Sequence, residues 1–352
     1  MIYTAKSPGR PTQLRADLCV VGSGAGGATV AALLAERGAS VVCLEAGPYV
    51  TPRDMTQREG EMLGRLFADS GSVTDAAASV RVLHGRCIGG STVHNNNLIK
   101  RAPAEVLETW RKEAGLVELS DAHLDDLYAE VEAALSVTPM TEDMVNANNQ
   151  VLRDGAARLG YATALLSHNR RDCLKSGFCT LGCSFDAKEN ALKVMVPRAV
   201  RAGATVLADC RVDGVEVAGG RAVRVRARDV VVEAEIVCVA AGALDTPVLL
   251  RKSGLPDPHG VTGRHLHLHP GVAVAGVMER VIQGWIGIPQ SIECTQFQRE
   301  GVWIVPAFAH PIASATMLPG FGDEHARWMA LYPRLGAEAF ACVELQKLQA
   351  YL

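Results

Sequence analysis

Three glycines near the N-terminus have the spacing Gly-x-Gly-x-x-Gly, which indicates a phosphate-binding turn. They are Gly22, Gly24 and Gly27. In such a turn the first glycine permits a tight bend, the second lets the backbone approach a pyrophosphate, and the third lets a helix pack closely on a strand. Glu45 follows Gly27 by 18 residues, a spacing suited to hydrogen bonds with a ribose. An acid here disfavours a 2′-phosphate, so the pattern predicts a site for FAD or NAD rather than NADP.

A second glycine-rich loop, from His84 to Asn97, carries small polar side chains that suit contact with a planar ring. Ser91 and Thr92 are small hydrogen-bonding residues on a flexible backbone. Asn95 offers both a donor and an acceptor to the polar edge of such a ring. The two asparagines after it are expected to be solvated turn residues.

Three cysteines lie within eleven residues, at Cys173, Cys179 and Cys183. Thiolates are soft ligands that hold zinc or iron–sulfur clusters, although no fourth ligand for zinc is evident. Three interpretations remain open. In the first, the cysteines are structural and are either all reduced or present as one disulfide and one thiol. In the second they hold an iron–sulfur cluster, and in the third they hold zinc.

Two groups of histidines are further candidates for chemistry. His265, His267 and His269 alternate, so a strand would place all three on one face, where they could bind a metal. His310 precedes a proline after the β-like stretch 302–308. It could line a substrate cavity, and a structural role is the alternative.

The elements that must position these residues follow from hydrophobic patterning. An apolar strand over 17–21, an alanine-rich helix over 28–37 stopped by Gly38, and a strand over 40–44 form one βαβ unit. Residues 186–203 read as an amphipathic helix, interrupted at Pro197, whose charges face solvent. The chain then becomes β-rich, with strands expected at 205–207, 211–217, 222–227 and 230–239 and a helix at 244–252.

Length and composition exclude several classes of protein. The 352 residues allow one large domain or two ordinary ones, and the net charge of −3 implies no nucleic-acid partner. No apolar stretch reaches the length of a membrane span. The first 17 residues lack the apolar core of a signal peptide. A cytoplasmic protein is therefore expected, and a disulfide framework is not.

The two loops and a third stretch carry a resemblance to a known family. The loop containing Gly85, Arg86, Ile88–Thr92 and Asn95 resembles the first signature of the glucose–methanol–choline (GMC) oxidoreductases, and 242–254 resembles the second. Residues 124–139 and 261–270 resemble the family's helix after the flavin loop and a stretch ending in His-Pro. The likeness extends from about residue 17 to residue 276, in the family's order.

This resemblance implies an α/β fold: a Rossmann-like FAD-binding domain over 1–270, with inserted cap segments, followed by an incomplete antiparallel α+β substrate domain over 271–352. FAD is the implied cofactor, and His94 is where some members attach it covalently; the alternative is a histidine packed nearby without a bond. Cysteine-rich segments in some members hold an iron–sulfur cluster that serves an electron-acceptor protein. In the family, His269-Pro270 is a structural turn. The residues expected to contact the cofactor are Gly22, Gly24, Ala25, Gly27, Glu45, Gly90, Ser91, His94, Asn95, Val212 and Ala241.

The implied activity is oxidation of a CH–OH group in an alcohol, sugar or sterol, with hydride passing to flavin N5. The family's catalytic base is a histidine in a C-terminal segment that has no counterpart before Leu352. The catalytic residues are therefore unassigned, and the chain is interpreted as C-terminally truncated. Its alternative interpretation is an FAD-binding relic or interaction module without turnover.

Overall fold

The structure is a computed structural model that describes residues 1–78, 80–118, 120–268, 271–308, 310–315, 320–338 and 340–347. The chain divides into two compact units, each built from two separate segments. Unit 1 comprises Met1–Asn95 and Thr180–Leu266, and unit 2 comprises Asn96–Cys179 and His267–Leu352. Residues 96–179, which the sequence grouped with the cofactor domain as cap segments, thus belong to the same compact unit as the segment from His267.

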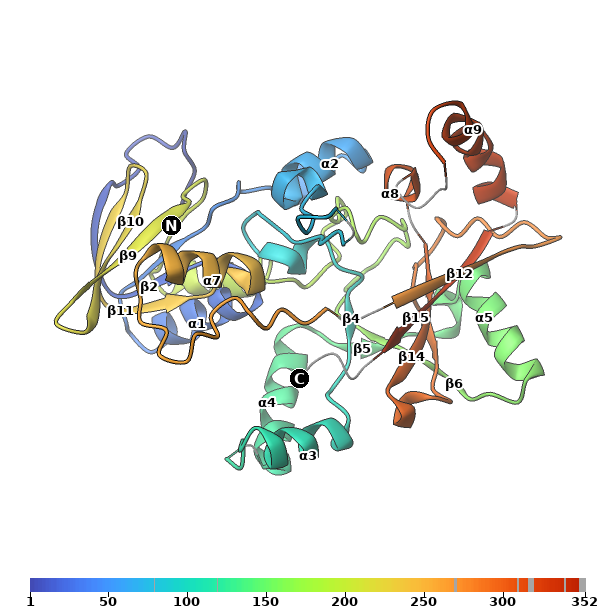
Figure 1. Cartoon of the computed structure of the whole chain (residues 1–352), viewed down its shortest axis with the longest axis horizontal. Helices are drawn as coiled ribbons and strands as arrows, with labels where there is room; N and C mark the ends of the chain where they lie inside the picture. The colour runs from blue at the N-terminus through green and yellow to red at the C-terminus, as the bar shows by residue number, and fades with distance from the viewer. Residues whose placement is uncertain are drawn as a thin grey trace. The chain divides into compact units, whose positions relative to one another are not determined.

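Unit 1 is built on a seven-stranded sheet in the order β1-β8-β3-β2-β11-β10-β9. Strands β2, β9, β10 and β11 of this sheet are labelled in Figure 1. The strands from β1 to β11 in this order pair in parallel, and β10 and β9 extend the sheet antiparallel. The bounds are β1 (Ile2–Tyr3), β2 (Gln13–Val21), β3 (Val41–Leu44), β8 (Thr205–Leu207), β9 (Val212–Ala218), β10 (Arg221–Ala227) and β11 (Val231–Val239). The α/β class and Rossmann-like arrangement expected from the sequence are therefore confirmed.

Helix α1 (Ala25–Glu36) follows β2 directly and connects it to β3. Its alanines at 28, 31, 32 and 35 are buried, a spacing that places four small side chains on one face. Small side chains allow α1 to lie close to its neighbours, and α1 contacts β2, β3 and α6. Gly38, with φ of +93°, ends the helix as predicted. The remaining helices of unit 1 are α2 (Glu59–Leu66), α6 (Met195–Arg201) and α7 (Gly242–Lys252), with 3₁₀ turns at Pro52–Asp54, Ala68–Gly71 and Gly90–Val93.

Unit 2 contains two antiparallel sheets. The larger has the order β12-β15-β14-β13-β6, with β12 (Gly271–Val277), β15 (Phe340–Lys347), β14 (Val302–Ala307), β13 (Ile292–Cys294) and β6 (Thr163–Leu165). The smaller has the order β4-β7-β5, with β4 (Leu98–Ile99), β7 (Ser167–His168) and β5 (Thr138–Pro139). The helices are α3 (Ala104–Glu113), α4 (Asp121–Ala134), α5 (Ala147–Arg158), α8 (Pro311–Ala315) and α9 (Asp323–Glu338), with 3₁₀ turns at Glu142–Met144 and Gln298–Glu300.

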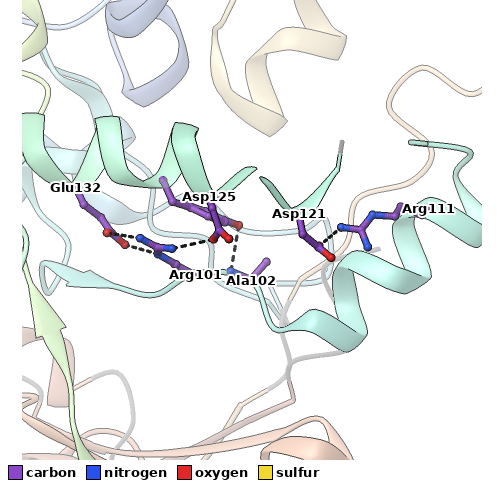
Figure 2. A network of polar contacts seen from close by, with 7 residues as sticks. Arg101, Ala102, Arg111, Asp121, Asp125 and Glu132 are labelled. Atoms are coloured by element: carbon purple, nitrogen blue, oxygen red, sulfur yellow. Dashed lines mark hydrogen bonds and ion pairs between the residues drawn. The ribbon is translucent and has the colours of Figure 1, made fainter. Parts of the chain in front are cut away.

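A network of ion pairs joins α4 to the segments before it in unit 2 (Figure 2). Arg101 donates from Nε and Nη2 to the two carboxylate oxygens of Glu132, both at 2.7 Å, and from Nη1 to Asp125 at 3.0 Å. Arg111 on α3 pairs with Asp121 at the start of α4. These groups are in contact with solvent, so the pairs contribute little to stability.

The sequence raised a strand that would align His265, His267 and His269 on one face. Residues 265–268 are irregular rather than a strand, so the pattern that would align His265 and His267 on one face is absent. His269 lies outside the described residues.

Among the helices that the structure describes, none is long and apolar enough to span a bilayer.

Candidate cofactor-binding site

The residues that follow β2, β3 and β11 meet at the carboxyl edge of the parallel sheet in unit 1. The Gly22 amide donates to the Leu44 carbonyl at 2.8 Å, and the Ala240 amide donates to the Val21 carbonyl at 2.8 Å. Gly22 has φ of +99°, and a Cβ there would lie 2.4 Å from the Ala240 carbonyl oxygen. Only glycine fits this position. Open α/β sheets bind ligands at this edge.

The N-terminus of α1 opens toward solvent at the same edge. Gly24 caps the helix without any side-chain hydrogen bond, and Ala25 and Gly26 are exposed. The first-turn amides of a helix have no partner within the helix and carry its positive dipole end, so together they bind phosphate. The structure thus presents oriented donors where the sequence predicted a pyrophosphate.

The second glycine loop passes directly over this helix end. A Cβ on Gly90 would lie 2.9 Å from the Cα of Gly24, and Gly90 has φ of +54°. The Ser91 hydroxyl accepts a hydrogen bond from the Gly85 amide at 2.8 Å, which closes the loop. Ser91 and Asn95 are exposed, so both side chains remain accessible to a ligand.

Glu45 fastens the two glycine loops together rather than projecting into solvent. It is 6% exposed, and its Oε2 accepts from the amide and hydroxyl of Ser23 at 2.9 and 2.7 Å, while Oε1 accepts from the Gly47 amide at 2.9 Å. The Ser23 hydroxyl in turn accepts from the Gly89 amide at 3.1 Å. Burial raises the pKa of Glu45 even though these hydrogen bonds oppose the shift. Ser23 went unnoticed in the sequence because it is a variable position of the glycine motif.

The remaining predicted contacts also lie in unit 1, beside Glu45 and the end of β11. The Glu45 amide donates to the Leu207 carbonyl at 2.8 Å, and the Cys210 amide donates to the Glu45 carbonyl at 2.8 Å. Val212 begins β9 two residues later, and Ala241 caps α7; both pack on the core of the sheet. Every residue expected to contact the cofactor therefore belongs to one compact unit.

His94 is a buried, neutral imidazole. It is 8% exposed, its ring centroid lies 4.0 Å from that of Phe67, and its Nε2 has no hydrogen-bond partner among the described residues. Burial, assisted by the charge of Lys188, lowers the pKa of His94 to about 4. An unprotonated ring with one unsatisfied nitrogen is the form in which histidine acts as a nucleophile.

Lys188 holds the backbone on both sides of His94. Its side chain is 2% exposed, and Nζ donates to the carbonyls of Val93 and Asn95, each at 2.8 Å. The sequence expectation that the charges of residues 186–203 face solvent is therefore wrong for Lys188, and also for Glu189, which is 6% exposed. The buried carbonyls draw the ammonium inward, and an amphipathic pattern cannot reveal that preference. Only the last part of that segment forms a helix, α6.

A cavity of about 180 Å³ in unit 1 adjoins this lysine. Its lining residues come from the segment after β3, the segment before α6 and the first turn of α6. They are Tyr49, Thr51, Pro52, Met55, Cys183, Asp186, Lys188, Asn190, Leu192, Lys193 and Pro197.

The three cysteines that the sequence offered as metal ligands fall in two different units. Cys183 belongs to unit 1, whereas Cys173 and Cys179 belong to unit 2. Among the described residues, no group of three or more His, Cys, Asp and Glu side chains could hold a metal ion. His310 is 6% exposed and stacks on Phe178 at 4.9 Å in an aromatic cluster of unit 2.

Replacing His94 with phenylalanine is expected to make the protein less sensitive to acid. A histidine with its pKa lowered from 6.5 to about 4 contributes stability that is present above pH 6.5 and is lost as the pH falls toward 4. Between pH 7 and pH 4.5 the loss from one such group is about 2 to 3 kcal/mol. Urea unfolding at both pH values measures it. The wild type also loses stability in acid through His168 and His310, which have the same shift in pKa. Between pH 7 and pH 4.5 the His94→Phe variant should therefore lose about 2 to 3 kcal/mol less unfolding free energy than the wild type. Equal losses would contradict the lowered pKa of His94.

The sequence matches the family model described as GMC oxidoreductase over residues 63–271 and that of an NAD(P)-binding Rossmann-like domain over residues 20–69. An uncharacterized GMC-type oxidoreductase of Mycobacterium tuberculosis is 34% identical over 333 residues, which are 92% of this chain and 53% of that protein. A long-chain-alcohol oxidase of Arabidopsis thaliana is 29% identical over 275 residues, 73% of this chain and 36% of that protein. The chain thus spans about half the length, or less, of these relatives.

Solved structures show the same fold at low sequence identity. Pyridoxine 4-oxidase from Mesorbium loti superimposes with a TM-score of 0.61 and 16% identity, over 94% of this chain and 71% of that one. Formate oxidase from Aspergillus oryzae superimposes with a TM-score of 0.64 and 13% identity, over 97% of this chain and 74% of that one.

Proposed function

The chain belongs to the GMC oxidoreductase family, and on this basis we propose that unit 1 binds FAD as part of an oxidoreductase that acts on alcohol-type CH–OH groups. The observation that carries the proposal is the uncapped, exposed N-terminus of α1 directly beneath Gly90. A pyrophosphate needs oriented amide donors and the absence of side chains, and Gly24 and Gly90 supply both. The unsatisfied Nε2 of His94 is a second feature that fits a bound ring system.

Different residues of the site contact different parts of the cofactor. The amides at the start of α1 bind the pyrophosphate, and Glu45 keeps the two glycine loops in register. Ser91 and Asn95 offer accessible polar groups toward the ring, while Lys188 fixes the backbone that carries His94. When bound, the flavin supplies a two-electron acceptor for the oxidation of an alcohol. The base that takes the hydroxyl proton is not among these residues.

The substrate class rests on relatives. The Arabidopsis proteins are named long-chain-alcohol oxidases, and an alcohol is the class we propose for this chain. The chain spans about half the length of its mycobacterial relative. A protein that binds FAD without turnover is the second candidate. Oxygen and an electron-acceptor protein are both candidate oxidants.

Purified protein, supplied with FAD and then desalted, should retain a visible absorption spectrum of bound flavin. Loss of the flavin on desalting would overturn the proposed cofactor. Anaerobic addition of a panel of primary, secondary and long-chain alcohols then tests the reaction, because a bleached flavin band reports reduction. Reoxidation by air or by a dye distinguishes the two kinds of acceptor. Bound flavin that no alcohol bleaches would favour the second candidate.

We expect part of the flavin to stay attached to the polypeptide after acid denaturation, through His94. The reason is the neutral, buried imidazole whose Nε2 is unsatisfied. Acid-precipitated wild-type protein should therefore remain yellow, and the His94→Phe variant should release all of its flavin into the supernatant. Flavin absorbance in the two fractions measures the outcome. A colourless wild-type precipitate would leave His94 as a packing residue beside the flavin.

A further inference from the structure

Two arginines of unit 2 have opposite surroundings. Arg101 is 43% exposed at its side chain and contacts two carboxylates, those of Glu132 and Asp125 (Figure 2). Arg170 is 4% exposed, and among the described residues no carboxylate lies within ion-pair distance of it. Its Nη2 donates to the Asn96 carbonyl and lies 3.8 Å from Cys179 Sγ. The buried cation is therefore the one without a formal counter-charge.

The unsatisfied atoms around Arg170 are mainly donors. Arg170 Nε and Nη1 are buried without a hydrogen-bond partner among the described residues, and so is Nε2 of His168. The Nδ1 of His168 accepts from the Arg170 amide at 3.0 Å. A neutral imidazole that accepts at one nitrogen carries its proton on the other, so His168 Nε2 is a donor as well. Burial, with Arg170 nearby, lowers the pKa of His168 to about 4 and keeps it neutral.

Asn96 contacts Arg170 through its backbone. Its side-chain oxygen is also buried without a partner among the described residues. An amide can present either its oxygen or its NH₂ group, so Asn96 is able to donate once a suitable acceptor is present. Its backbone carbonyl already accepts from Arg170.

An anion satisfies these buried donors and the charge of Arg170 better than water alone. A buried charge destabilises the folded state strongly unless an opposite charge pairs with it. A water molecule can accept one or two of the hydrogen bonds, but it does not neutralise the guanidinium. A carboxylate or a halide accepts several hydrogen bonds and supplies the missing charge.

We propose that Arg170 and His168 form a binding site for a small monoanion in unit 2, occupied either by a free ion or by the carboxylate group of a small molecule. The site involves none of the residues assigned to FAD, so it can be tested whether or not the cofactor binds.

Thermal unfolding of the full chain in a low-chloride buffer tests the proposal. Bromide and acetate are titrated at constant ionic strength against gluconate, an anion too large for a buried site. Ligands that bind the folded state raise the midpoint of unfolding in a saturable way. We expect the wild type to respond to at least one of the two small anions, acetate alone indicating a carboxylate site. The Arg170→Met variant should lose this response, whereas Arg101→Met, which removes an exposed arginine, should keep it.

Crystals of the wild type soaked in bromide give an independent reading if Arg170→Met fails to fold. Anomalous density beside Arg170 and His168 would support the site, and His168→Phe should weaken bromide or acetate binding several-fold. The proposal is overturned if neither small anion stabilises the wild type beyond gluconate. It is equally overturned if Arg170→Met responds as the wild type does, since the guanidinium would then not be the binding group.

Discussion

Replacing Gly27 with alanine is expected to abolish FAD binding and to lower the free energy of unfolding by about 3 kcal/mol or more. A Cβ at this position would lie 2.0 Å from the carbonyl oxygen of Gly22 and 3.1 Å from the Cβ of Ala240. The first contact is with backbone, so no side-chain rotation relieves it. Either α1 must move away from β2 or the Gly22 turn must open. Both changes displace the amides that would bind the pyrophosphate.

The neighbouring glycine supplies a matched control. Gly26 lies in the first turn of α1, and a Cβ there would have no atom within 4 Å. Alanine is a better helix former than glycine by about 1 kcal/mol, so Gly26→Ala should be as stable as the wild type or more stable. Urea unfolding and retained flavin absorbance compare the two variants. Equal stability of Gly27→Ala and Gly26→Ala would show that the contact with Gly22 imposes no strain.

Replacing Lys188 with methionine is expected to have the second largest effect. Methionine fills similar volume but leaves the carbonyls of Val93 and Asn95 without their donor. Each buried polar group left unsatisfied costs about 1 to 3 kcal/mol, so for two carbonyls a loss of about 2 to 6 kcal/mol in the free energy of unfolding is expected. The loop that carries His94 would also lose its position, and flavin affinity should fall with it.

Lys193 is the control for this substitution, because it lies five residues away and lines the same cavity. Its side chain is 29% exposed and pairs with Glu189 at 2.9 Å. Because Glu189 is buried, losing this ion pair also lowers the free energy of unfolding, but Lys193 donates to neither the Val93 nor the Asn95 carbonyl, so Lys193→Met should keep the flavin affinity that Lys188→Met loses. Denaturant unfolding and flavin titration of both variants give the comparison. A smaller loss of flavin affinity in Lys188→Met than in Lys193→Met would contradict the role that we give to the buried ammonium.

The cofactor edge of unit 1 was predictable because its signals are local. The turn at Gly22, the alanine face of α1 and the strand before Glu45 lie within one short stretch, and each residue has the conformational or packing property that its place requires. The strand expected at 205–207 is found as β8, and those expected at 40–44, 211–217, 222–227 and 230–239 differ by one residue at their ends, whereas β2 begins four residues before the expected start at residue 17. Such short-range patterns survive because tertiary contacts reinforce them.

Other features depend on contacts that no short pattern encodes. Strand β6 pairs with β13 through residues such as Ala164 and Glu293, which are 129 positions apart, and β4, β5 and β7 contain two residues each. The burial of Lys188 depends on carbonyls almost a hundred positions earlier in the chain. Asn97, expected in solvent, is 1% exposed, because the segments that cover it come from elsewhere in the sequence.

The pairing of β2 with β11 has a consequence for the way the protein is made. The two strands match along their whole length, from Gln13 opposite Val231 to Val21 opposite Val239. Val21 and Val231 are 210 positions apart, and a ribosome adding about 5 to 20 residues per second needs roughly 10 to 40 seconds to synthesise that interval. During this time β2 can pair with β3 on one side, while its other edge has no partner. An open strand edge is a template for misassembly, so the nascent chain must keep this edge protected until β11 emerges.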